Sequence, residues 1–190
     1  MTRPSKGRAF ADDLAMALRD CPRDERAIVF VSVLNSNLPS GSRAVLVGGA
    51  LVEFYTSGQY TTGDIDIVGD RDNIVRLLES AGFERTGRVY VNADLDLVID
   101  IAGQSLRRTE TVENVEVEGY SAPVVSIEDT VVDRLLAAKF WSSRTDWEQA
   151  TLLFEAHKSH IDGVELKRKA RENEVDDWLD KLLRGTSGRK

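Results

Sequence analysis

Cysteine is almost absent from this chain, because Cys21 is the single thiol among 190 residues. That scarcity excludes an intrachain disulfide framework and fits a reducing compartment. The two histidines, His157 and His160, lack neighbours that would complete a zinc ligand set. No hydrophobic run approaches the roughly 20 residues of a membrane span, and the first residues lack the apolar core of a signal peptide. We therefore expect a soluble, cytoplasmic protein with no membrane partner.

Basic residues are outnumbered by acidic ones in this chain. The formal net charge is −7, which argues against broad nucleic-acid binding, because affinity for a polyanion comes mostly from lysine and arginine. Hydrophobic residues make up 42% of the chain, which is enough for a real core. The length fits one domain with an appended helical part. A local basic patch remains compatible with this composition.

Hydrophobic periodicity divides the chain into a mixed α/β part and an all-helical part. We predict an N-terminal helical segment at 1–42, an α/β domain at 43–125, a helical domain at 126–185 and a disordered tail at 186–190. The run Ile28-Val29-Phe30-Val31 lies at helical spacing but is rich in β-branched residues, so a helix and a strand both remain open there.

Turn and cap residues delimit the remaining elements. The pattern predicts strands at 44–47 and 64–68, a hairpin at 88–91 and 95–102, and an outlying strand pair at 112–117 and 122–125. Helices are predicted at 49–55, 73–81, 145–156 and 162–183, and another begins after Ser126, a typical N-cap residue. The fold class is therefore α/β (α+β), with a mixed sheet flanked by helices and a C-terminal helical bundle.

Two features in the first part of the α/β domain point to chemistry. Gly48 and Gly49 follow a hydrophobic strand and open a helix, where backbone N–H groups can approach a phosphate closely. Asp64 and Asp66 then stand one residue apart on the next strand, so their side chains face the same way. Two carboxylates held side by side favour a hard divalent cation such as Mg²⁺ between them. Together these features predict a cleft that holds a phosphate and a metal.

The order strand, Gly48-Gly49, helix and Asp64-Ile65-Asp66 resembles the nucleotidyltransferase superfamily, which includes DNA polymerase β and the minimal nucleotidyltransferases. The resemblance is closest to AbiEii-toxin-like proteins, on Thr61-Thr62-Gly63, Gly82-Phe83, Ser126-Ile127-Glu128-Asp129 and Arg144-Thr145-Asp146-Trp147. Three positions depart from the toxin pattern: Arg134 stands for a lysine, Thr145 for the lysine of a Lys-Asp pair, and Gln149 for a second acid.

This resemblance implies a two-metal site of Mg²⁺, with Mn²⁺ as an alternative, and a third carboxylate beside Asp64 and Asp66. Asp96 fits best, because the superfamily places this acid near the start of a later strand and five more strand residues follow Asp96. Asp100 is the alternative, since it lies four residues further on and, by period two, on the same face. Thr62 is expected near the phosphates. The resemblance further implies that Arg134 and Asp146 on the C-terminal helices contact the nucleotide.

The expected function is a metal-dependent transfer of a nucleoside monophosphate from a nucleoside triphosphate to an acceptor hydroxyl. The acceptor is an RNA end, a protein or a small molecule. The alternative is a catalytically silent protein of this fold that binds a nucleotide or a protein partner, in a toxin–antitoxin or defence system. A homodimer also remains open. The three tryptophans and Lys139 are expected to serve packing and surface roles rather than base stacking or nucleotide binding.

Overall fold

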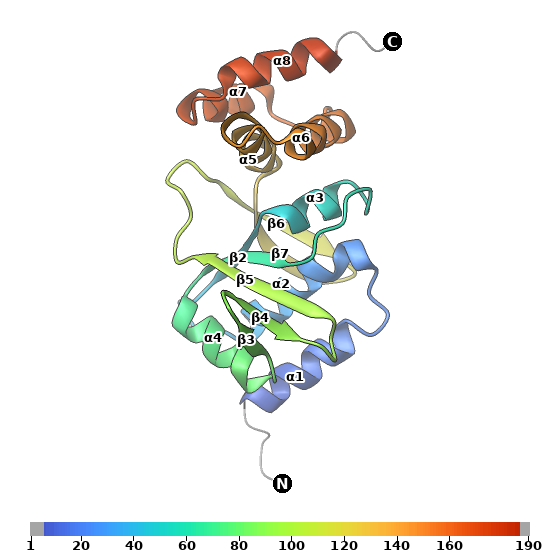
Figure 1. The fold of residues 1–190 in the computed structure, drawn as a ribbon. Helices are drawn as coiled ribbons and strands as arrows, with labels where there is room; N and C mark the ends of the chain where they lie inside the picture. Colours follow the sequence, from blue (N-terminus) through green and yellow to red (C-terminus); the bar gives the residue numbers. More distant parts are fainter. Residues whose placement is uncertain (1–5, 187–190) are drawn as a thin grey trace.

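The computed structural model describes residues 6–186, so the tail predicted at 186–190 lies almost entirely outside the described residues. Seven strands form one sheet, and the helices cover its two faces (Figure 1). The strands are β1 (Ala44–Val47), β2 (Ile65–Gly69), β3 (Glu84–Thr86), β4 (Val89–Asn92), β5 (Leu97–Gly103), β6 (Val112–Val117) and β7 (Tyr120–Val125). The helices are α1 (Lys6–Ala17), α2 (Arg26–Asn37), α3 (Gly49–Tyr55), α4 (Arg71–Ser80), α5 (Ile127–Phe140), α6 (Arg144–His157), α7 (Gly163–Glu172) and α8 (Asp176–Thr186), with a 3₁₀ turn at Arg23–Glu25.

The sheet is mixed, with strand order β3-β4-β5-β2-β1-β7-β6. β1 runs antiparallel to β2, whereas β2 and β5, and also β1 and β7, pair in parallel. The expected fold class, a mixed sheet flanked by helices, is therefore confirmed. The hairpin β6–β7 was expected to be outlying, but β7 joins the sheet through its pairing with β1, so the hairpin extends the same layer.

Helix α2 resolves the ambiguity at residues 28–31 in favour of a helix. Residues Ala27 to Leu34 are all buried, because α2 packs between the sheet and helix α1. A helix enclosed on all sides needs no polar face, so a continuous apolar run is compatible with it. The N-terminal helices share one hydrophobic core with the sheet, so the segment before residue 43 is integral to the α/β fold.

Helices α5 to α8 form the C-terminal bundle around a second hydrophobic core, which lies above α3 and the sheet (Figure 1). Ser126 caps α5 as expected, since its hydroxyl accepts a hydrogen bond from the Asp129 backbone N–H. The single helix expected at 162–183 is in fact two helices. Glu174 has a positive φ of 58°, and the turn around it places Val175 fully inside the core.

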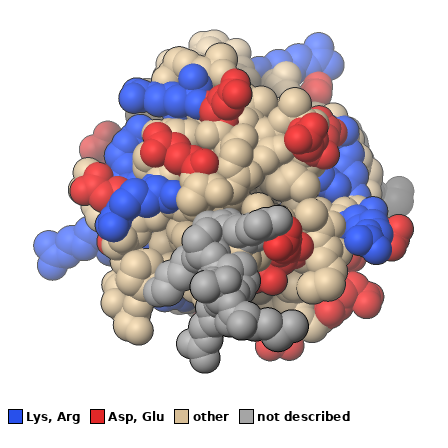
Figure 2. Space-filling model, turned by 90° about the horizontal axis from the view of Figure 1, so that it is seen from below, with Lys and Arg blue, Asp and Glu red and all other residues tan. Residues whose placement is uncertain are grey.

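No helix within residues 6–186 is long and apolar enough to cross a membrane. On the face seen from below, basic and acidic side chains are interspersed around the described surface (Figure 2). That mixture follows from a composition in which 32 acidic residues outnumber 25 basic ones without long runs of either sign.

Candidate active site

Gly48 is the residue on which the geometry of the site depends. The antiparallel register pairs Val47 with Asp66, so the chain turns at Gly48 directly beside that carboxylate. A Cβ on Gly48 would lie 2.2 Å from Asp66 Oδ2, and its φ of +73° is also unfavourable for residues with side chains. Both the space and the backbone conformation therefore require glycine. The neighbouring Gly49 N–H donates a hydrogen bond to the Asp66 carboxylate.

Three carboxylates converge at this point: Asp64, Asp66 and Asp100 each offer an oxygen, and these oxygens lie within 4.8 Å of one another. Asp64 directly precedes β2 and Asp66 lies within it, while the parallel pairing of β2 with β5 places Asp100 beside Asp66. Carboxylate oxygens are the donors that hard divalent cations prefer, so this donor set fits such an ion. The expected pairing of Asp64 and Asp66 on one side of the strand is seen in the structure.

The pKa of Asp66 reflects its burial and the charges of the neighbouring carboxylates. Partial burial raises the pKa of Asp66 to about 6, and the negative charges of Asp64 and Asp100 act in the same direction. The Gly49 N–H and the more distant Arg134 oppose that rise. A carboxyl whose ionised form is disfavoured by its like-charged neighbours is stabilised when a cation binds among them. The cluster is therefore arranged to gain from cation binding.

Asp100, rather than Asp96, lies beside the pair. Asp96 is exposed in the turn before β5 and has a positive φ of 49°, so the period-two argument that put it on the face of Asp100 does not apply. Strand β5 begins only at Leu97, where the alternation starts. The geometry thus favours the alternative third carboxylate over the one that the sequence ranked first.

Thr62 lies behind the carboxylates and supports them. Its hydroxyl is 3.4 Å from Asp64 Oδ1, and its backbone N–H donates to the buried Glu53 of α3 at 2.8 Å. Arg23, from the turn before α2, donates through Nε to the same glutamate at 3.1 Å. This chain of contacts fixes the loop that precedes β2 against α3, and through it the position of Asp64.

Arg134 and Asp146 meet across α5 and α6, as an ion pair of 2.8 Å. The Arg134 guanidinium also contacts Asp133 and lies 3.3 Å from Gln149 Oε1, one of the positions that depart from the toxin pattern. Its Nε is buried without a hydrogen-bond partner among the described residues. Arg134 is therefore held in place by other side chains, close enough to Asp66 to influence its charge.

Two cavities flank the carboxylate cluster. The larger, of about 260 Å³, lies between the sheet and α5 and is lined by Gly48, Asp66, Arg107 and Asp133 among others. The smaller, of about 110 Å³, lies on the side of the N-terminal segment and is lined by Asp64, Thr62, Arg23, Arg26 and Asp96 among others. Each cavity thus contacts one member of the Asp64–Asp66 pair. Sequence reasoning missed Arg107, which stands on the loop between β5 and β6.

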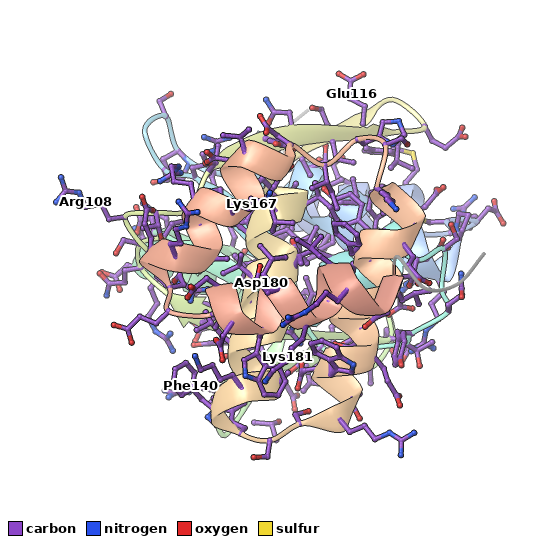
Figure 3. The ribbon with its side chains drawn as sticks, turned by 90° about the horizontal axis from the view of Figure 1, so that it is seen from above. Arg108, Glu116, Phe140, Lys167, Asp180 and Lys181 are labelled. Atoms are coloured by element: carbon purple, nitrogen blue, oxygen red, sulfur yellow. The ribbon has the colours of Figure 1, made fainter. Side chains whose placement is uncertain are left out.

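The remaining expectations concern packing residues. Lys139 pairs with Asp177 at 2.8 Å, and His157 Nε2 lies 2.6 Å from the Tyr55 carbonyl oxygen. Trp147 and Trp178 are half-buried and contact each other edge to face. Trp141, however, is 81% exposed at the end of α5, so it does not serve the expected packing role within the described part of the chain. It follows directly after the last turn of the helix, where Phe140 is also exposed (Figure 3).

A solved structure has the same arrangement of elements. The chain superposes on the crystal structure of an antigenic nucleotidyltransferase-like protein from Paracoccidioides brasiliensis with a TM-score of 0.55, at 18% sequence identity. The match covers 83% of this chain and 92% of that one. The fold is that of a nucleotidyltransferase-like protein. No protein-family model and no curated protein sequence matches this chain.

The nucleotidyltransferase-like fold confirms the coarser part of the resemblance in the sequence, namely the fold. At this identity the likeness concerns the arrangement of helices and strands alone. The chemistry must therefore be argued from the side chains of this chain, above all from Asp64, Asp66 and Asp100.

Proposed function

We propose that this protein is a magnesium-dependent nucleotidyltransferase that moves a nucleoside monophosphate from a nucleoside triphosphate onto an acceptor hydroxyl. The observation that carries the proposal is the cluster of Asp64, Asp66 and Asp100 beside the glycine turn at Gly48. Mg²⁺, or Mn²⁺ in its place, would supply Lewis-acid stabilisation of the charge that develops on the phosphate oxygens.

The three carboxylates divide the work in this proposal. Asp64 and Asp66 hold the metal ions, and Asp100 completes the ligand set and orients the attacking hydroxyl, the role first assigned to Asp96. Gly48 and Gly49 let the outer phosphates approach the backbone, since neither presents a side chain. Thr62 keeps Asp64 in position through its contact with that carboxylate.

The two cavities provide separate places for the two substrates in this proposal. We assign the triphosphate and nucleoside to the larger cavity, with Arg134 and Asp146 on the helices nearby. Arg107 lines this cavity, where it pairs with Glu110 and Asp133, and it would exchange one of these partners for a phosphate. The acceptor then enters the smaller cavity beside Asp64. Displacement at phosphorus requires the attacking and leaving oxygens to be roughly in line, and two cavities that flank the carboxylates meet that demand.

A small molecule or a protein side chain fits the role of acceptor better than a bulky RNA. The net charge of −7 opposes the approach of a long polyanion. The cavity on the acceptor side is also small, at about 110 Å³.

The proposal is tested by incubating the protein with Mg²⁺ and each labelled nucleoside triphosphate, with and without bulk RNA and cell lysate. Pyrophosphate release and a labelled product are expected. Asp64→Asn, Asp66→Asn and Asp100→Asn should each abolish transfer while the fold is retained. Asp180→Asn is the matched control, because Asp180 is exposed (Figure 3) and lies on α8, at the end of the helical bundle away from the sheet (Figure 1). Absence of both label transfer and metal-dependent nucleotide binding would exclude this function.

A second candidate is a binding module of the same fold without turnover. It is favoured by the ion pairs that already engage Arg134 with Asp133 and Asp146, and by Gln149 in place of an acid. In that case the resemblance to AbiEii-toxin-like proteins suggests a cytoplasmic role in a toxin–antitoxin or defence system, with a protein partner or a homodimer. Nucleotide binding without any pyrophosphate release would support it.

A further inference from the structure

Arg88 reaches the carboxylate cluster from a part of the chain that sequence reasoning did not connect with it. It lies in the tight turn between β3 and β4, where Gly87 has a positive φ of 62°. The register of β4 with β5 pairs Val89 with Asp100, so Arg88, which directly precedes Val89, lies next to Asp100. The Arg88 Nη2 lies 2.8 Å from Asp100 Oδ2.

The two members of this ion pair differ sharply in exposure. The Asp100 side chain is 9% exposed, whereas that of Arg88 is 78% exposed. A buried carboxylate needs a counter-charge, but an exposed arginine can leave its partner at little cost in packing. Within residues 6–186, Arg88 is the only cation in ion-pair contact with Asp64, Asp66 or Asp100.

We infer that Arg88 is a built-in counter-ion for Asp100, which competes with a divalent metal for that carboxylate and must swing aside when the metal binds. The inference rests on the proposed function, because it assumes a metal at the cluster. The Arg88 guanidinium engages Oδ2, one of the two oxygens that the Asp100 carboxylate can offer a metal, and it also repels a second positive charge at short range. Arg88 would thereby lower metal affinity and keep the metal-free cluster partly neutralised.

Calorimetric titration of the metal-free protein with Mn²⁺, without nucleotide, tests this directly. Arg88→Gln is expected to bind Mn²⁺ about fivefold more tightly than the wild type, the scale of an exposed ion pair. Arg88→Lys, which keeps the positive charge, should stay close to the wild type. Arg108→Gln is the matched control, since Arg108 extends from the body of the protein into solvent and should leave affinity unchanged (Figure 3).

Thermal unfolding supplies a second readout, in which the gain in unfolding temperature on adding Mn²⁺ is the part that a merely structural arginine would not change. Arg88→Gln should unfold at a lower temperature than the wild type in chelator, because Asp100 loses its partner, and should gain more from saturating Mn²⁺. Equal or weaker Mn²⁺ binding by Arg88→Gln would overturn the inference while leaving the proposed function intact, provided that the wild type binds. If neither protein binds Mn²⁺, the inference and the metal-dependent function both fail.

Discussion

Asp66 and Asp129 both line the larger cavity, and their surroundings differ. Asp129 at the start of α5 is 4% exposed and pairs with the fully buried Lys169 of α7 at 2.9 Å. It also accepts hydrogen bonds from the Ser126 hydroxyl and the Thr111 N–H, each at 2.8 Å. Around Asp66, by contrast, the nearest charges are negative, and the pKa is raised.

The difference separates a carboxylate with favourable partners from one whose nearest charged neighbours repel it. The Lys169 ammonium donates hydrogen bonds to Asp129, the Thr109 carbonyl oxygen and the Thr111 hydroxyl, so its three N–H groups all have partners. These contacts hold the helical bundle against the segment before β6. A network of this kind stabilises the fold and leaves no capacity for a ligand. The Asp64–Asp66–Asp100 cluster differs, because its carboxylates repel one another and Arg88 is the one cation among the described residues that pairs with any of them.

The largest effect is expected at the satisfied pair. Lys169→Met leaves Asp129 buried without its cation, which should lower the free energy of unfolding by about 3–5 kcal/mol. Denaturant unfolding followed by circular dichroism measures it. Lys167→Met is the control on the same helix, because Lys167 is exposed (Figure 3) and should change stability by less than about 0.5 kcal/mol. A loss below about 1 kcal/mol for Lys169→Met would show that the pair contributes little.

At the Asp64–Asp66–Asp100 cluster, Gly48→Ala should impair metal binding more than it impairs folding. Its Cβ would collide with the Asp66 carboxylate, and its φ of +73° adds strain of about 1–3 kcal/mol. Displacement of Asp66 should weaken Mn²⁺ binding by about tenfold or more, as loss of an outer-shell support does. Gly63→Ala is the control, since a Cβ there meets no atom within 4 Å. Unchanged Mn²⁺ affinity in Gly48→Ala would contradict this account of the glycine.

The raised pKa of Asp66 predicts a pH-dependent stability in chelator. Its folded pKa of about 6 lies above the ordinary 3.8, so the protonated form favours folding, and that contribution is lost as pH rises through 6. Asp66→Asn should therefore be more stable than the wild type by about 1–2 kcal/mol at pH 7.5, after allowance for partial exposure. The advantage should vanish below pH about 4. A constant difference across this range would indicate that Asp66 titrates normally.

The sequence predicted much of this site because its signals are local. Asp64 and Asp66 are two residues apart at the start of β2 and converge there, and the glycine turn marked the close approach at Gly48. Asp100 and Arg88 reach the cluster through strand pairings with β2 and β5, and no local pattern encodes such a register. The same holds for Lys169, which is fully buried although its partner Asp129 lies 40 residues away in the sequence.

The smallest effect is expected at Asp96, which the sequence ranked first as the third carboxylate. Asp96→Asn should leave Mn²⁺ affinity unchanged, because Asp96 is exposed in a turn outside the group of three carboxylates. Asparagine tolerates the φ of 49° at this position about as well as aspartate, so the free energy of unfolding should change by less than about 0.5 kcal/mol. Asp100→Asn, measured in the same titration, should lose affinity by contrast. If Asp96→Asn weakened Mn²⁺ binding and Asp100→Asn did not, the third ligand would come from the turn, and Arg88 would guard a carboxylate that the metal never uses.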